Sequence, residues 1–196
     1  MKERKDVFEA AEIVAQILKD HGVEPIVIGA IAMAVHRHIR FTEDLDLGVN
    51  AEILTLRELV SAFEAEQFEV HLREPDTNDP LSGVIDIIGP FGLIQVVSFS
   101  QRFPAVINDS LQASTLSLSE GSLLKIPPLP HLIALKLYAG GIKSAADIIS
   151  LLIRNPDADL EAIRTLCKKY RLRGLDALVA EAEVERSNRP NKDLSS

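Results

Sequence analysis

The spacing of hydrophobic and polar residues predicts alternating helices and strands up to residue 126. Apolar residues recur every three to four positions in three segments, which predicts helices over 6–21, 30–38 and 52–66. Shorter apolar or alternating runs predict strands over 25–28, 45–49, 68–72, 83–88, 93–99 and 123–126. Between 102 and 119, Ser and Thr alternate with Leu and Val, and we interpret this segment as one or two short edge strands.

The pattern changes at Pro127, Pro128 and Pro130, after which every periodic segment is helical. We expect these helices over 132–138, 143–154, 159–170 and 174–186. The sequence therefore predicts an α/β domain over 1–127, a helical domain over 128–188 and a disordered tail over 189–196. The fold class that follows is α+β, with a mixed sheet flanked by helices and a C-terminal helical bundle.

Composition limits the classes of function. Hydrophobic residues make up 46% of the 196 residues, and the net charge is −8. This charge argues against an extended surface for non-specific nucleic-acid binding, but it leaves room for a local basic patch. The single cysteine excludes an intrachain disulfide and favours a reducing compartment. The absence of a secretory or membrane-spanning apolar run leads us to expect a cytoplasmic protein without a membrane partner.

Two carboxylates, Asp44 and Asp46, lie two positions apart in a predicted strand that is otherwise apolar. Alternate strand residues point to the same face, about 7 Å apart along the backbone. Two like charges have no packing role there, and hard divalent cations such as Mg²⁺ prefer oxygen ligands. Asp86, a third acid in an apolar strand, would join them if the two strands are neighbours. The alternative is that Asp44 belongs to a turn or helix cap and that Asp86 is a buried acid whose hydrogen bonds are formed within the protein.

Gly29 lies between a predicted strand and a predicted helix, 15 residues before Asp44. Glycine at this point allows close approach of the backbone and exposes helix N-terminal amides to a phosphate group. Glycines that end strands are common, so Gly29 gains significance only from the Asp pair that follows it.

Together these residues resemble the DNA polymerase β-type nucleotidyltransferase superfamily: a Gly and a small residue, a helix, Asp-x-Asp and a later Asp in a strand. The match is closer to the AbiEii-like nucleotidyltransferases of toxin–antitoxin systems, which carry a run similar to HRHIRFTEDLDL at 36–47. The segment LIALKLYAGGIKSAADIISLL at 132–152 is similar to a helix pair of that branch, with Lys136 in the first helix and Asp147 in the second. The resemblance covers most of residues 25–153.

The resemblance implies a nucleotidyltransferase-type sheet and a magnesium-dependent (or manganese-dependent) transfer of an NMP from an NTP to a hydroxyl acceptor. Asp44, Asp46 and Asp86 would bind the metal, and Asp86 is also a candidate general base. The implied partners are the NTP, an acceptor that is an RNA such as tRNA or a protein, and a cognate antitoxin.

The resemblance also implies a nucleotide-binding set. Gly29 and Ala30 would lie along the triphosphate, Lys136 would contact its phosphates, and Asp147 would support the site from the helical domain. Without the resemblance, Lys136 would be interpreted as a surface lysine and Asp147 as an exposed helix acid.

Three positions depart from the family pattern. Ala30 stands where the family generally has Ser or Gly, Gly141 where relatives commonly carry Arg, and Ser144 where they commonly carry Asp. Loss of a phosphate-binding hydroxyl and of a cation would lower nucleotide affinity or change the nucleotide that is preferred.

Several other residues have simpler interpretations. His36 and His38 are two apart in a predicted helix, so they face different directions, and we interpret them as core or interface residues. Five cations, Arg164, Lys168, Lys169, Arg171 and Arg173, form a local basic cluster, which is either a solvated helix end or a contact to RNA.

We therefore carry three functional hypotheses. The first is an active nucleotidyltransferase, with a role as the toxin of a toxin–antitoxin pair. The second is a catalytically inactive protein of the same fold that binds a partner or nucleotide, which Ala30 and Gly141 motivate. The third is a small-molecule nucleotidyltransferase of the antibiotic-modifying type.

Overall fold

The computed structural model describes residues 6–42, 44–75, 81–100 and 103–188, so the predicted tail at 189–196 lies outside it. The chain divides into two compact units. The first consists of 1–34 and 39–128, and the second of 35–38 and 129–196. Residues 35–38, which lie within the predicted domain 1–127, thus group with the helical part of the chain.

The first unit is built on a seven-stranded mixed sheet with the order β3-β4-β5-β2-β1-β7-β6. β2 pairs with β5 and β1 pairs with β7 in parallel, and the remaining pairs are antiparallel. The predicted α+β class with a mixed sheet is confirmed. The strands are β1 (Ile26–Ile28), β2 (Asp44–Val49), β3 (Glu69–Arg73), β4 (Gly83–Gly89), β5 (Gly92–Ser98), β6 (Leu116–Ser117) and β7 (Lys125–Ile126).

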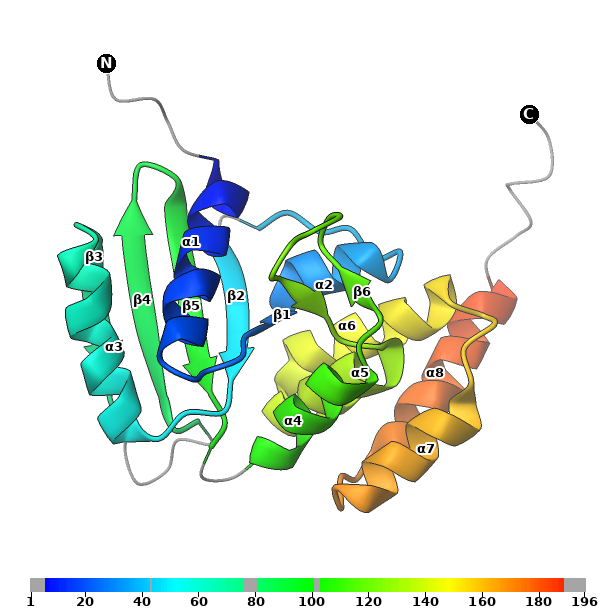
Figure 1. Ribbon diagram of the computed structural model, residues 1–196. Helices are drawn as coiled ribbons and strands as arrows, with labels where there is room; N and C mark the ends of the chain where they lie inside the picture. Colours follow the sequence, from blue (N-terminus) through cyan, green and yellow to red (C-terminus); the bar gives the residue numbers. More distant parts are fainter. Residues whose placement is uncertain (1–5, 43, 76–80, 101–102, 189–196) are drawn as a thin grey trace, which may run out of the picture. The chain divides into compact units, whose positions relative to one another are not determined.

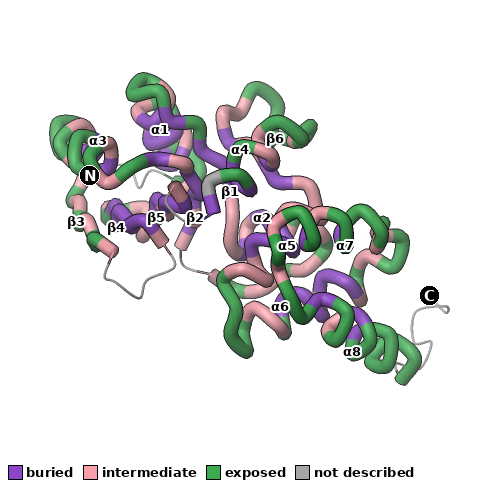
Figure 2. Tube along the Cα trace, turned by 90° about the horizontal axis from the view of Figure 1, so that it is seen from below, coloured by how far each residue is buried: buried purple, intermediate pink, exposed green. Residues whose placement is uncertain are grey.

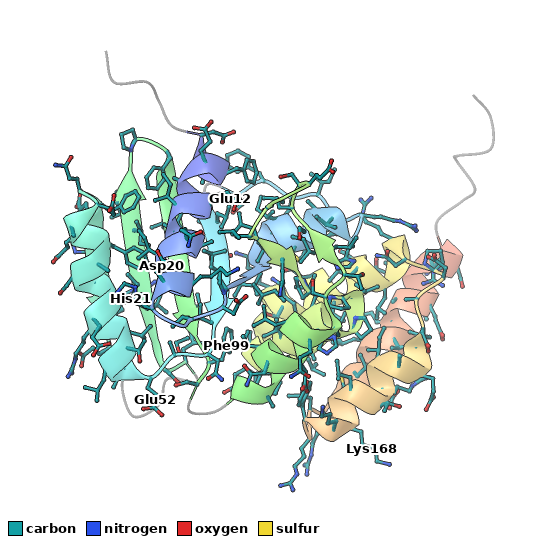
Figure 3. All side chains as sticks on the ribbon, in the orientation of Figure 1. Glu12, Asp20, His21, Glu52, Phe99 and Lys168 are labelled. Atoms are coloured by element: carbon teal, nitrogen blue, oxygen red, sulfur yellow. The ribbon has the colours of Figure 1, made fainter. Side chains whose placement is uncertain are left out.

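Four helices belong mainly to this unit: α1 (Val7–Asp20), α2 (Gly29–Val35), α3 (Ile53–Ala65) and α4 (Pro104–Ala113). α1 packs against α3 and β5, and α3 also contacts β3 and β4, so both helices cover one face of the sheet (Figure 1). Glu12 of α1, labelled in Figure 3, accepts a hydrogen bond from the Leu123 N–H at 3.0 Å. This bond attaches the segment before β7 to α1, and so to the helices that cover this face of the sheet.

Helix α4 is a correction to the sequence interpretation, because the region 102–119 was expected to hold only edge strands. Val106, Ile107 and Ser110 are fully buried, and this spacing is that of one helical face. Pro104 at the start of the helix is the signal that could have identified it, because proline is favoured in a first helical turn. The expected edge strand is present as well, since β6 ends the sheet.

The second unit contains α5 (Leu129–Ala139), α6 (Gly141–Arg154), α7 (Leu160–Lys169) and α8 (Leu175–Asn188). α5 contacts α6 and α7, and α6 contacts α8. Figure 2 shows the buried stretches of α6 and α8, which include Ile148, Leu151 and Val179. Among the described residues, no helix has both the length and the apolar character needed to span a membrane.

Candidate active site

Strand β2 places Asp44 and Asp46 on one face of the sheet. Leu45 and Leu47 are buried, whereas both Asp residues are partly exposed, as expected for alternate positions of a strand that is covered on one side. Gly48 follows on the Asp face, and a Cβ atom there would lie 3.0 Å from Ile107 of α4. Because Gly48 has no side chain, Ile107 of α4 packs closely against this end of β2, while Asp44 and Asp46 stay partly exposed.

The backbone of Gly29 lies directly against the carboxylate of Asp46. Asp46 is opposite Ile28 in the β1–β2 ladder, and Gly29, which directly follows β1, lies against its side chain. A Cβ atom at Gly29 would overlap the Asp46 Oδ2 atom and lie 2.8 Å from its Cγ. Gly29 also has a φ of +69°, a conformation that side chains disfavour. Both constraints require glycine here.

Asp44 is held from the segment that precedes β2. The Thr42 hydroxyl donates a hydrogen bond to the Asp44 Oδ1 atom, and it also lies 3.1 Å from the Asp44 carbonyl oxygen. A carboxylate fixed by a neighbouring hydroxyl keeps a second oxygen for another ligand. Ile39 and Phe41, which lie shortly before Thr42, are 82% and 84% exposed.

Asp86 shares the face of the Asp pair but lies two strands away. Asp46 is opposite Gln95 on β5, and Gln95 is opposite Asp86 on β4. The strands of Asp46 and Asp86 are therefore not neighbours, and about 10 Å separates them across the sheet. In residues 6–42, 44–75, 81–100 and 103–188, no three His, Cys, Asp or Glu side chains lie close enough to hold a metal ion. A site that uses all three acids requires side-chain movement.

Asp86 is engaged by two residues that the sequence interpretation missed. Arg73 donates from Nε and Nη2 to the two carboxylate oxygens, at 2.8 and 2.9 Å. Gln95 Nε2 donates to Asp86 Oδ1 at 2.6 Å. The two-residue turn at Pro90 and Phe91 between β4 and β5 fixes the register that places Gln95 opposite Asp86, so this partner could have been found from the sequence. Arg73 had no comparable signal.

The second unit holds the other two predicted site residues. Lys136 Nζ lies 2.8 Å from Asp147 Oδ2, and the two side chains are only 14% and 7% exposed. His38 Nε2 lies 3.7 Å from the other oxygen, Asp147 Oδ1. Asp147 is thus the centre of a buried polar cluster, and the Lys136 ammonium is committed to it.

The same unit binds the segment that leads from α2 toward β2. Asn155 Nδ2 donates to the His36 carbonyl at 2.8 Å, and Arg37 forms an ion pair with Asp157 at 3.3 Å. With the contact of His38 to Asp147, three successive residues are attached to helical-unit side chains. This attachment explains why residues 35–38 group with the helices.

The buried pair predicts a large effect on stability. We expect Lys136→Met to lower the free energy of unfolding by about 3 kcal/mol, because it leaves the Asp147 carboxylate buried without its cation. Arg164→Met is the matched control: it breaks the exposed Arg164–Asp176 pair and should cost less than about 1 kcal/mol. Urea unfolding monitored by circular dichroism measures both. Equal effects of the two substitutions would contradict the structural role of the pair.

Comparison of the sequence with protein-family models and with curated proteins found no match. The chain is similar in structure to the antibiotic-resistance factor ANT(2'')-Ia, whose solution structure superposes with a TM-score of 0.51 at 15% identity over 94% of this chain and 100% of that one. The crystal structure of ANT(2'')-Ia with adenylyl-2''-tobramycin gives a TM-score of 0.52 at 14% identity, over 84% and 97% of the two chains. At this identity the likeness establishes the fold, which is that of the nucleotidyltransferases.

Proposed function

We propose that this protein transfers the nucleoside monophosphate of an NTP to a hydroxyl group, with a divalent cation held by Asp44 and Asp46. The observation that carries the proposal is the partly exposed Asp pair on one face of β2, with the Gly29 backbone against Asp46. The nucleotidyltransferase fold supports it. The oxygen donors suit Mg²⁺ or Mn²⁺.

In the proposed reaction, the acceptor oxygen attacks the α-phosphorus and the bond from that phosphorus to the bridging oxygen breaks. Pyrophosphate leaves with the electron pair, and the hydroxyl proton passes to a carboxylate, for which Asp86 is the candidate. When bound, the cation would neutralise phosphate charge and help to align the reactants. Asp44 and Asp46 would hold it, and Gly29 with Ala30 would allow the triphosphate to approach the backbone.

In this proposal Asp86 becomes available only when Arg73 releases it. Arg73 is 57% exposed at its side chain, so its guanidinium can leave the carboxylate without crossing the core. A guanidinium binds phosphate oxygens with the same bidentate geometry that it uses for carboxylates. We infer that Arg73 exchanges Asp86 for the triphosphate when the nucleotide binds. The proposed role of Lys136 at the phosphates likewise requires it to leave Asp147.

The exchange predicts that Arg73 opposes metal binding in the absence of nucleotide. We expect Arg73→Gln to tighten Mn²⁺ binding about tenfold, because it frees a carboxylate and removes a nearby cation. Arg57→Gln is the control, since Arg57 forms a similar bidentate pair with Glu74 at 2.9 and 3.0 Å. Titration followed by the electron paramagnetic resonance of free Mn²⁺ measures both variants. An unchanged Mn²⁺ affinity of Arg73→Gln would rule out the exchange.

The identity of the acceptor distinguishes two specific versions of the proposal, an AbiEii-like toxin and an antibiotic-modifying enzyme. Incubation of the protein with α-labelled NTPs, Mg²⁺ and a panel of tRNA, protein and aminoglycoside acceptors tests them together. Label in tRNA or protein, with growth arrest on expression that a cognate antitoxin relieves, supports the AbiEii-like toxin version. Label in the aminoglycoside supports the antibiotic-modifying version. No transfer to any acceptor, together with no metal-dependent NTP binding, would contradict the proposal.

A second candidate is a catalytically inactive binding protein with this fold. Two observations favour it: Ala30 supplies no hydroxyl for phosphate, and both carboxylate oxygens of Asp86 already accept hydrogen bonds from Arg73 or Gln95. If the protein is an inactive binding protein, its biological effect should be unchanged in Asp44→Ala. If it is an active transferase, the same substitution should abolish that effect.

A further inference from the structure

An open, basic hollow of about 600 Å³ lies at the turn between α7 and α8, within the helical unit. Its lining includes the cations Arg164, Lys168, Arg171 and Arg173, the thiol of Cys167 and one acid, Asp176. Lys168 extends from the end of α7 into solvent, as Figure 3 shows. The hollow is much larger than a single phosphate group.

The charge of this hollow is opposite to that of the protein as a whole. Residues 164–173 contain five basic side chains and no acid, although the chain carries a net charge of −8. Arg164 is paired with Asp176 at 3.0 Å. Within the described part of the chain, Lys168, Arg171 and Arg173 form no ion pair. Three exposed cations are therefore available to an anionic ligand.

Arg171 occupies a backbone position that normally belongs to glycine. The Leu172 N–H donates to the Cys167 carbonyl at 2.9 Å and the Arg171 N–H to the Lys168 carbonyl at 3.0 Å, which is the Schellman ending of a helix. Arg171 has the left-handed φ of 56° that this ending requires. A residue with a side chain is unfavourable for the backbone at this position, so glycine can replace Arg171 without loss of the helix ending.

In the part of the chain that the structure describes, two other helices end in the same way and provide an internal comparison. α1 has Gly22 at the equivalent position, with a φ of 73°, and α3 has Gln67, with a φ of 63°. Their closing bonds are Val23 N–H to Leu18 O at 2.9 Å and Phe68 N–H to Phe63 O at 3.2 Å. A replacement by glycine at position 67 or 171 thus makes the same backbone change, but only the second removes a cation from the hollow.

The chemistry of the hollow is binding rather than thiol reactivity. Burial, with a smaller contribution from the charge of Asp176, raises the pKa of the Cys167 thiol to about 11. The thiol is therefore protonated at neutral pH and is a poor nucleophile. No large apolar side chain of the segment 160–176 is exposed, so the cations have no adjoining apolar surface of the kind that inserts into a lipid bilayer.

We propose that the α7–α8 hollow binds the phosphodiester backbone of a nucleic acid. Three of its four cations are arginines, whose planar guanidinium groups match phosphate oxygens. An assignment of this nucleic acid as the acceptor rests on the proposed transferase function, but the binding itself does not.

The test measures binding of the full chain to a fluorescent RNA of about 16 nucleotides, and to the DNA of the same sequence, without NTP or metal ion. We expect Arg171→Gly to weaken binding about five- to tenfold and to reduce the slope of log affinity against log salt by about one. Its melting temperature should equal or exceed that of the unmodified protein. Gln67→Gly should show the same thermal behaviour and unchanged binding.

Three further results complete the test. Lys168→Gln and Arg173→Gln should each weaken binding to a similar extent, which keeps the test decisive if one variant folds poorly. Tighter binding of the RNA or of the DNA of the same sequence shows which nucleic acid supplies the phosphodiester backbone. Equal binding by Arg171→Gly and Gln67→Gly, or binding to anionic phospholipid vesicles with none to either polynucleotide, overturns the proposal. Because no nucleotide or metal is present, a failure here is distinct from a failure of the transferase proposal.

Discussion

Asp46→Asn is expected to reduce nucleotidyl transfer by about 10³-fold or more, because it removes one of the two charges proposed to hold the cation. The substitution keeps the shape of the side chain, so the close approach of Gly29 to position 46 is preserved. The melting temperature should therefore change little. The assay is transfer of label from an α-labelled NTP at saturating Mg²⁺.

The control for this prediction is Asp20→Asn in α1. Asp20, labelled in Figure 3, is an exposed acid that accepts a hydrogen bond from Gln16 at 2.7 Å, and an asparagine oxygen can accept the same bond. Full activity of the control with loss of activity in Asp46→Asn supports the metal role. Activity of Asp46→Asn within a fewfold of the unmodified protein would contradict it.

Gly29→Ala is expected to destabilise the protein by about 3 kcal/mol and to remove its activity. One part of this cost is the left-handed backbone, which alanine disfavours by about 1 kcal/mol. The larger part comes from overlap of the new methyl group with the Asp46 carboxylate, which forces the side chain or the strand to move. Thermal and urea unfolding measure the stability, and the labelled-NTP assay measures the activity.

Gly22→Ala measures how much the left-handed backbone alone lowers the free energy of unfolding when alanine replaces glycine. Gly22 has a φ of +73°, close to the +69° of Gly29, but a Cβ atom at Gly22 would meet no atom within 4 Å. We expect a loss of only about 1 kcal/mol and no change in activity. Equal losses for the two glycines would mean that the contact with Asp46 has no energetic weight. In addition, Asp46→Ala should relieve part of the Gly29→Ala defect, so the two substitutions should not be additive.

Much of the fold could be predicted because its signals are local. The period of two along β2 places Asp44 and Asp46 on one face, and the short turn before Gly92 defines the β4–β5 hairpin. Helix α4 was missed because its polar residues obscured the helical period, although Pro104 marked its start. The alternation of Ser and Thr with Leu and Val between 102 and 119 resembles the period of a strand.

The remainder of the site depends on contacts between distant residues. That β5 pairs with both β2 and β4 is a property of strand order, so the separation of Asp86 from Asp46 has no sequence signal. The bidentate contact of Arg73 follows from the β3–β4 register, which joins strands separated by a long connection. The pairing of Lys136 with Asp147 joins two helices and is visible only once α5 packs on α6.

The most direct test of the central claim is a crystal structure of the protein with a non-hydrolysable NTP and Mn²⁺, with the metal located by its anomalous scattering. The account predicts Mn²⁺ bound to carboxylate oxygens of Asp44 and Asp46, the triphosphate beside Gly29, and Arg73 withdrawn from Asp86. Nucleotide bound elsewhere, or Mn²⁺ absent from the Asp44 and Asp46 carboxylates at saturating concentration, would contradict it.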